Sequence, residues 1–123
     1  IKAVAPIVRV ADYVDARLSA ISLKDEKNQA VNIGVFNENV HAYYADIDDV
    51  SVGGDNDTAS LTVTAKDPNA TIVVKNGSTT VSESAGAYSL TLVAGVNVIT
   101  ITSTVDSVEQ EAYVLVITYT QIT

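Results

Sequence analysis

The sequence predicts an all-β domain, an antiparallel β-sandwich of about seven or eight strands. Val, Ile and Thr recur along the whole chain, and their branched side chains suit a pleated strand but crowd a helix. From about residue 40 onward, short segments alternate apolar and polar residues, and turn signals separate them every ~8–12 residues. The 123 residues are 47% hydrophobic, which suits one domain with a buried core.

Each predicted strand rests on this alternation. In the last strand, Tyr113, Leu115 and Ile117 share a face that we expect to point into the core. Tyr43 and Tyr88 fall on inward positions of their own strands, where tyrosine rings fill sandwich interiors. In chain order, the predicted strands are Leu18–Leu23, Tyr43–Ile47, Ala59–Ala65, Thr71–Lys75, Thr79–Ser82, Tyr88–Leu92, Asn97–Ser103 and Ala112–Tyr119.

Turn residues separate these strands. Asn76-Gly77 can take positive φ at both central positions of a type I′ turn, so the strands on either side are expected to form a hairpin. Asp67-Pro68-Asn69 ends the preceding strand, because Pro limits φ and the flanking side chains bond to nearby backbone. Gly53–Asp57 is expected to form a loop, and Ala94-Gly95 a turn.

Residues 1–17 differ from the rest, and we predict that they form an N-terminal extension to a sandwich domain of residues 18–123. Ile1–Val10 is apolar, and Pro6 restricts it to an edge strand or an irregular strand. Exposing its apolar side chains would forgo about 25 cal/mol per Å² of apolar area, so we expect them to be buried. The interface candidates are Val4, Ile7, Val8, Val10 and Tyr13.

The sequence leaves the partner of this segment open. The segment could add as a strand to the sheet edge of a neighbouring copy, or it could pack within its own domain. A short helix over part of it is a further alternative, because Val14, Leu18 and Ile21 stand at helical spacing.

Composition and charge disfavour several classes of partner. With 15 acidic and 7 basic side chains, the net charge is −8, which argues against nucleic acid and anionic lipid as partners. No apolar run approaches the roughly 20 residues of a membrane span, so we expect a soluble product without membrane insertion. The chain has no Cys, which excludes disulfides and thiolate metal sites.

No constellation of catalytic residues stands out. His41 is the only histidine, and it has no evident partner for nucleophilic catalysis or for metal binding. Asp46, Asp48 and Asp49 precede the Gly53–Asp57 loop, and their oxygens could surround Ca²⁺, but the residue order of an EF-hand is missing. We therefore predict a protein that is not an enzyme and has no cofactor, with calcium as the alternative.

Loops at the ends of sandwiches often carry binding sites, which gives a second set of candidates. The candidates for loop binding are Tyr44, Asp55, Asn56 and Asp57. Among the tyrosines, Tyr13, Tyr44 and Tyr119 are candidates for a surface or an interface. A Lys–Asn isopeptide crosslink is a further alternative for a chain without Cys, although no local motif identifies one.

Several landmarks occur in a characteristic order between Leu18 and about Thr120. They are Leu18–Leu23, Phe36 with Tyr43, Ala45 and Ile47, Asp67–Ile72, Asn76-Gly77, Leu90–Leu92, Gly95, Asn97, Ile99, Ile101, Tyr113, Leu115 and Ile117. Their order resembles the bacterial cadherin-like β-sandwich domain, an immunoglobulin-like module of surface and secreted proteins. The polar segment Lys24–Val35 departs from this pattern, as does Val105–Glu111, where the family has a short Asp-Gly hairpin.

The resemblance implies an immunoglobulin-like sandwich with no catalytic residues. We therefore expect a noncatalytic structural module of an extracellular or cell-surface assembly, such as a surface-protein repeat, a filament subunit or a virion decoration. Its expected partners are other copies of itself or neighbouring domains, contacted through the N-terminal extension. The alternative is an adhesion module that binds glycan or a receptor through loops at one end of the sandwich.

The acidic residues lead to a first testable expectation. Because the spacing of a calcium loop is missing, millimolar Ca²⁺ should leave the melting temperature unchanged. Thermal unfolding followed with added calcium and then with a chelator checks this. A rise of several degrees that the chelator reverses would establish a calcium site.

Overall fold

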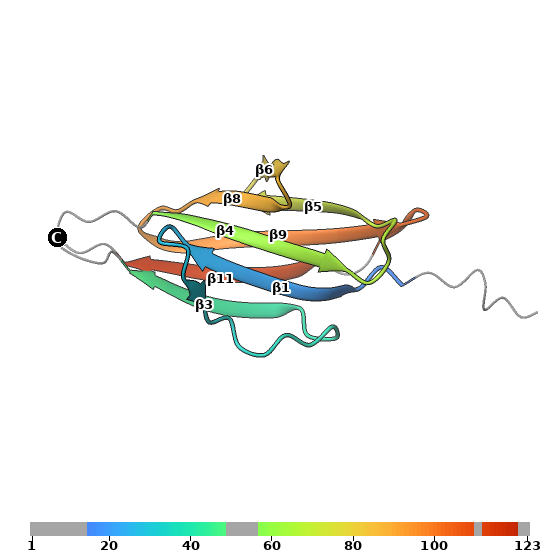
Figure 1. Cartoon of the computed structure of the whole chain (residues 1–123), viewed down its shortest axis with the longest axis horizontal. Coiled ribbons are helices and arrows are strands. Elements are labelled where there is room, and N and C mark those ends of the chain that lie inside the picture. The colour runs from blue at the N-terminus through green and yellow to red at the C-terminus, as the bar shows by residue number, and fades with distance from the viewer. Residues whose placement is uncertain (1–14, 49–56, 110–111, 121–123) are drawn as a thin grey trace, which may run out of the picture.

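The computed structural model describes residues 15–48, 57–109 and 112–120. Within these ranges the chain is all β, and its strands form two sheets that pack face to face along their length (Figure 1). The predicted sandwich is therefore confirmed. All the strands expected from alternation are present. The structure adds three two-residue strands, β2 (Ala30–Val31), β7 (Glu83–Ser84) and β10 (Val108–Glu109), which are too short to show a period.

Sheet A is antiparallel throughout. It has five strands in the described ranges. In spatial order, its strands are β2 (Ala30–Val31), β1 (Leu18–Asp25), β4 (Thr58–Ala65), β8 (Ala87–Thr91) and β7 (Glu83–Ser84).

Sheet B is mixed, because its edge strand β3 runs parallel to the last strand, β11. The other strand pairs of the described chain are antiparallel, as the sequence predicts. In spatial order, sheet B contains β3 (Ala42–Asp48), β11 (Tyr113–Thr120), β9 (Gly95–Val105), β5 (Thr71–Asn76) and β6 (Thr79–Val81), and β10 (Val108–Glu109) pairs with β9.

The strand order is that of an immunoglobulin-type sandwich. One sheet carries β1-β4-β8-β7 and the other β5-β9-β11, which corresponds to the ABED and CFG sheets of that architecture. Figure 1 shows β3 at one border of the molecule and β6 at the opposite border. Sheet B therefore ends in a seven-residue edge strand on one side and a three-residue edge strand on the other.

The core lies between the sheets and follows the predicted alternation. Tyr113, Leu115 and Ile117 are completely buried. Tyr43, beside them on β3 of the same sheet, and Tyr88, on β8 of the other sheet, are also buried. Tyr119 is also buried, so its assignment as a surface candidate is wrong: it continues the inward row of β11.

The helical alternative fails at Leu18 and Ile21, which lie in β1. The register between β1 and β4 shifts between Leu18 and Ala20, as a β-bulge does, and Ser19 is exposed there. This extra residue places Leu18 and Ile21 three positions apart on the same buried face. A bulge in a strand therefore produced the spacing of a helix.

The turns are tight but differ in detail from the expectation. The hairpin between β5 and β6 forms, yet Asn76 pairs with Thr79, so Gly77 and Ser78 occupy the central positions. Gly77 has φ 62°, the pattern of a type II′ turn. Asn76 therefore ends a strand, which corrects the predicted type I′ turn.

Type I′ geometry occurs instead at two other hairpins. Ala85 and Gly86 both have positive φ between β7 and β8. Asp106 and Ser107 also both have positive φ, between β9 and β10, and Ser107 stands at the position where Gly is usual. The predicted cap at Asp67 is confirmed, because its Oδ1 accepts a bond from the Asn69 N–H at 2.8 Å.

The Ala85 turn gives a stability prediction. An alanine at φ 53° is in a left-handed conformation that Asn tolerates better, so Ala85→Asn should raise the free energy of unfolding by about 0.5–1 kcal/mol. Urea unfolding measures the change. Ser89→Asn, at an exposed strand position of β8, is the matched control and should bring no gain. Equal effects of both variants would contradict the strain argument.

Candidate functional site

The outer edge of β3 has backbone groups directed away from the sheet. The Val114 N–H donates to the His41 carbonyl at 2.7 Å, and this bond sets the pattern of the parallel ladder. In that pattern Tyr43, Ala45 and Ile47 bond to β11. The N–H and C=O groups of the alternate residues, Ala42, Tyr44, Asp46 and Asp48, therefore point to the open side of β3.

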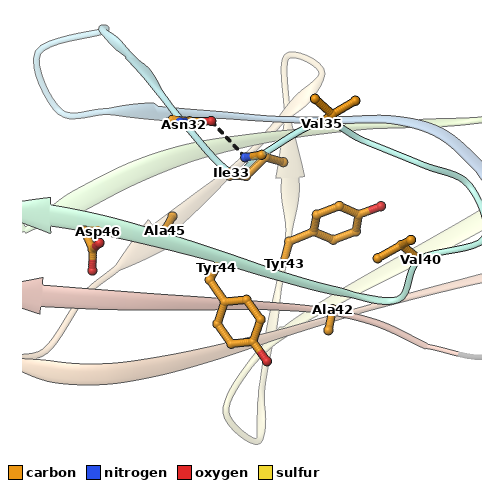
Figure 2. A pocket seen from close by; sticks show the side chains of 10 residues that line it. Asn32, Ile33, Val35, Val40, Ala42, Tyr43, Tyr44, Ala45 and Asp46 are labelled. Atoms are coloured by element: carbon orange, nitrogen blue, oxygen red, sulfur yellow. Dashed lines mark hydrogen bonds between the residues drawn. The ribbon is translucent and has the colours of Figure 1, made fainter.

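A groove runs along this open edge. It has a volume of about 540 Å³ and lies between β3 and the loop of residues 32–40 (Figure 2). In this loop, Ile33 is buried, whereas Val35 is 91% exposed and Val40 is 43% exposed. The groove therefore combines strand backbone groups that point to its open side with apolar side chains that face water.

The loop that forms the other wall of the groove is held by the core. The Tyr43 hydroxyl donates to the Asn37 carbonyl at 2.7 Å and accepts from the Asn37 N–H at 3.0 Å. The ring of Phe36 stacks on that of Tyr43, with centroids 5.6 Å apart. At the start of the loop, the Asn32 carboxamide accepts from the Gly34 N–H. The groove is thus formed in the free chain.

The outer face of sheet B adjoins this edge and is nearly free of charge. Tyr44, Val116 and Val98 lie side by side on β3, β11 and β9. Tyr44 is 68% exposed, and Val96 in the next row is 63% exposed. The outward side chains of β9 and β11 are all valine or threonine: Val96, Val98, Thr100, Thr102, Thr104, Val114, Val116, Thr118 and Thr120.

Acidic groups border this face on one side. Asp46 and Asp48 project from β3 on the same side as Tyr44, and both are exposed. On the far side, Lys75 projects from β5, opposite Thr100 of β9. The open edge of β3 is therefore negatively charged, whereas the strands behind it are neutral.

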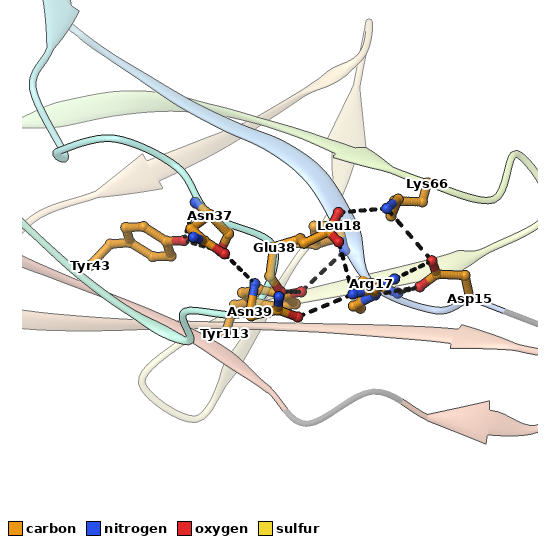
Figure 3. Close-up of polar contacts among 9 residues, drawn as sticks. All are labelled: Asp15, Arg17, Leu18, Asn37, Glu38, Asn39, Tyr43, Lys66 and Tyr113. Carbon is orange, nitrogen blue, oxygen red and sulfur yellow. Dashed lines mark hydrogen bonds and ion pairs between the residues drawn. The ribbon is translucent and has the colours of Figure 1, made fainter.

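A cluster of charged residues fixes the chain where it enters β1 (Figure 3). Arg17 pairs with Asp15 and with Glu38, each at 2.8 Å, and Lys66 pairs with Glu38 and Asp15. The hydrogen bonds from the Arg17 side chain hold the pKa of Asp15 well below its usual range. This cluster joins the start of β1 to the 32–40 loop and to the end of β4.

His41 lies in the connection before β3 and has a packing role. Its ring stacks on Tyr113 with centroids 4.3 Å apart. The Tyr113 hydroxyl donates to the Glu38 carbonyl at 2.7 Å and accepts from the Leu18 N–H. Burial raises the pKa of this tyrosine. His41 thus packs on a core tyrosine just before β3 begins.

Of the predicted loop-binding residues, the structure describes Tyr44 and Asp57, which lie at different sheets. Tyr44 lies on the outer face of sheet B, whereas Asp57 precedes β4 in sheet A, where its carbonyl accepts from the Leu92 N–H. The other candidates lie outside the described residues: Val4, Ile7, Val8, Val10, Tyr13, Asp49, Asp55 and Asn56.

Several residues of the groove and the outer face were not identified from the sequence. Val35 and Val40 stand in a polar segment without periodicity, so no local signal marks them. A signal did exist for the outer face, because both faces of the last strand are apolar. Such a strand is normally covered on both sides.

In the described ranges, no three His, Asp or Glu side chains gather as a metal site would require. The lysines of these ranges, Lys24, Lys27, Lys66 and Lys75, are exposed, and the buried Asn97 donates to the carbonyls of Val93, Gly95 and Ile117. Asn97 is thus bonded to backbone and has no buried lysine beside it in this part of the chain.

Comparison with known protein families and with curated proteins found no match. The strand order shows the sandwich, and many unrelated proteins share that fold. The likeness to cadherin-like domains therefore stays a prediction. Within the described ranges, the structure contains no helix of the length and apolarity needed to cross a membrane.

The charged cluster gives a pH-dependent prediction. A carboxyl with a depressed pKa stabilises the fold above its unfolded pKa of about 3.9, and this contribution is lost as the pH falls. Asp15→Asn should therefore lower the free energy of unfolding near neutral pH by up to about 1 kcal/mol, a loss that shrinks below about pH 4. Denaturant unfolding across this pH range measures it. Glu109→Gln, at an exposed position of β10, is the control, and a loss of the same size and pH dependence there would contradict the assignment.

Proposed function

We propose that the chain is a noncatalytic structural module of an extracellular assembly and that it self-associates through residues 1–17. Its partners would be other copies of itself or neighbouring domains. The observation that carries the proposal is the open edge of β3 beside the uncharged outward side chains of β11 and β9. Soluble proteins usually guard such edges with Pro, Lys, a bulge or a covering loop.

β3 has few of these guards. It is seven residues long and contains neither Pro nor Lys. Its register with β11 is continuous from Ala42 to Asp48, so no bulge twists it away. Its two outward aspartates keep the edge soluble by repelling other acidic edges, yet they leave it able to receive a segment of opposite charge.

The rest of the molecule supports a mechanical role. In the described ranges, a continuous hydrophobic core fills the space between the sheets. Arg17 bonds to Asp15, and the buried Asn97 bonds to backbone. The extracellular setting rests on the resemblance to surface modules and on the acidic composition without Cys. A glycan- or receptor-binding adhesion module is the second candidate, favoured by the exposure of Tyr44 at the border of the groove.

Deleting residues 1–12 tests self-association. The deletion leaves Asp15 and the core in place, so the shortened chain should stay folded but become monomeric, whereas the full chain should associate with increasing concentration. Light scattering coupled to size-exclusion chromatography measures the mass, and thermal unfolding checks the fold. Replacing the same residues with a Gly/Ser sequence of equal length is the control and should also give a monomer.

Two outcomes would contradict the proposal. A full chain that stays monomeric at all concentrations would remove the evidence for assembly. A shortened chain that unfolds would show that the segment belongs to its own domain. If, in addition, the monomer bound immobilised glycans and Tyr44→Ala abolished this binding, the adhesion role would take its place.

A further inference from the structure

We propose that the groove beside β3 receives residues 1–10 of a second copy, which add to the open edge as an antiparallel strand. This inference rests on the self-association proposed above and names the surface that accepts the segment. Added strands gain affinity from backbone hydrogen bonds and specificity from alternate side chains. The groove offers both kinds of contact.

The lengths of the two partners match. Ten residues in an extended conformation span about 33 Å, and the seven residues of β3 span about 23 Å, so the segment can cover the whole edge. The other edge of sheet B, β6, is only three residues long. β3 is therefore the edge of sheet B that can hold a segment of this length.

Pro6 determines which residues of the segment face β3. It has no N–H, so it can occupy an added strand only where its nitrogen points away from the partner strand. The backbone N–H and C=O groups of the even-numbered residues then point away from β3. Those of the odd-numbered residues form the hydrogen bonds to β3. The bonding residues are Ile1, Ala3, Ala5, Ile7 and Arg9.

The side chains then favour an antiparallel direction. In an antiparallel pair, bonded residues stand directly opposite each other and share a face, so Arg9 would lie on the side of Tyr44 and Asp46. Val4, Val8 and Val10 would lie on the inner side, toward the apolar wall of the groove. That wall contains Ile33, Val35 and Val40. A parallel strand would reverse these faces and turn Arg9 toward the apolar wall.

Charge complementarity agrees with this direction. Residues 1–10 contain Lys2 and Arg9 and no acidic residue, although the chain as a whole has a net charge of −8. The edge that they would join carries Asp46 and Asp48. Two copies of an acidic protein repel each other, so pairing their basic segment with an acidic edge fixes the site of contact.

The length of the connection limits the chain's own segment. Asp15 is held beside Lys66 and Arg17 at the start of β1, and Figure 3 shows Glu38 and Asn39 between this pair and Tyr43. Residues 11–14 span at most about 14 Å, whereas the segment of a second copy has no such limit.

Two full-length variants test the inference by separating its halves. Asp46→Pro removes an N–H that points to the open edge and leaves the ladder between β3 and β11 intact. Val4→Asp combined with Val8→Asp places charges on the side of the segment that would face the groove. Each variant alone should be monomeric. An equimolar mixture should form a heterodimer, because Asp46→Pro keeps an intact segment and the double aspartate variant keeps an intact β3 edge.

Asp46→Ala is the matched control for the edge variant, since it loses the same charge but keeps the N–H. Sedimentation velocity should give a dissociation constant at least about tenfold weaker for Asp46→Pro than for Asp46→Ala, as expected for the loss of an interstrand hydrogen bond. Thermal unfolding confirms that each variant is folded.

If Asp46→Pro does not fold, a charge reversal replaces it. Arg9→Asp and Asp46→Arg should each weaken association, and the chain that carries both should recover it. Failure to recover would overturn the inference.

The outcomes separate this inference from the proposed function. If wild-type chains associate and Asp46→Pro associates as strongly as Asp46→Ala, the groove is not the acceptor, yet self-association stands. If wild-type chains are monomeric, the inference is overturned. It is also overturned if the mixture gives no heterodimer, as expected when each segment occupies β3 of its own chain. A heterodimer in the mixture and monomers apart would establish the strand exchange.

Discussion

The parallel pairing of β3 with β11 is the constraint on which the rest of the arrangement depends. β1 and β3 follow each other closely in the sequence, yet β1 pairs in sheet A and β3 in sheet B. The chain therefore crosses between the sheets through residues 32–41, along one side of the sandwich. Because β3 is the last strand of its sheet, the pairing that buries Tyr43 and Ile47 leaves alternate backbone groups directed outward.

The crossing segment, residues 32–41, is held by core tyrosines on its inner side and by an ion pair at the surface. The hydroxyls of Tyr43 and Tyr113 bond to the backbone of Asn37 and Glu38, and the rings of both tyrosines belong to the core. At the surface, the Glu38 carboxylate pairs with Arg17. An irregular segment is thereby fixed by buried aromatic residues and by an ion pair. The shape of the groove follows from core packing, since the loop has no regular structure of its own.

Much of the fold followed from local patterns, and the differences have physical causes. Alternation located every longer strand because one face of each strand is buried. The helical alternative for Leu18 and Ile21 arose because a bulge near Ser19 changed the period of β1. The turn at Gly77 is shifted by one residue because the pairing of β5 with β9 extends to Asn76. Pairing between distant strands thus overrode the preference of the Asn-Gly dipeptide.

The sequence by itself determined the inward faces of the strands, the all-β class and the places where the chain turns. Each of these depends on neighbouring residues and on burial, which act over a few positions. Only the tertiary structure decided that β3 pairs with β11, that its outer edge stays open, and that Val35 and Val40 stand beside that edge. Those features depend on which distant strands meet, and no residue near β3 encodes its partner.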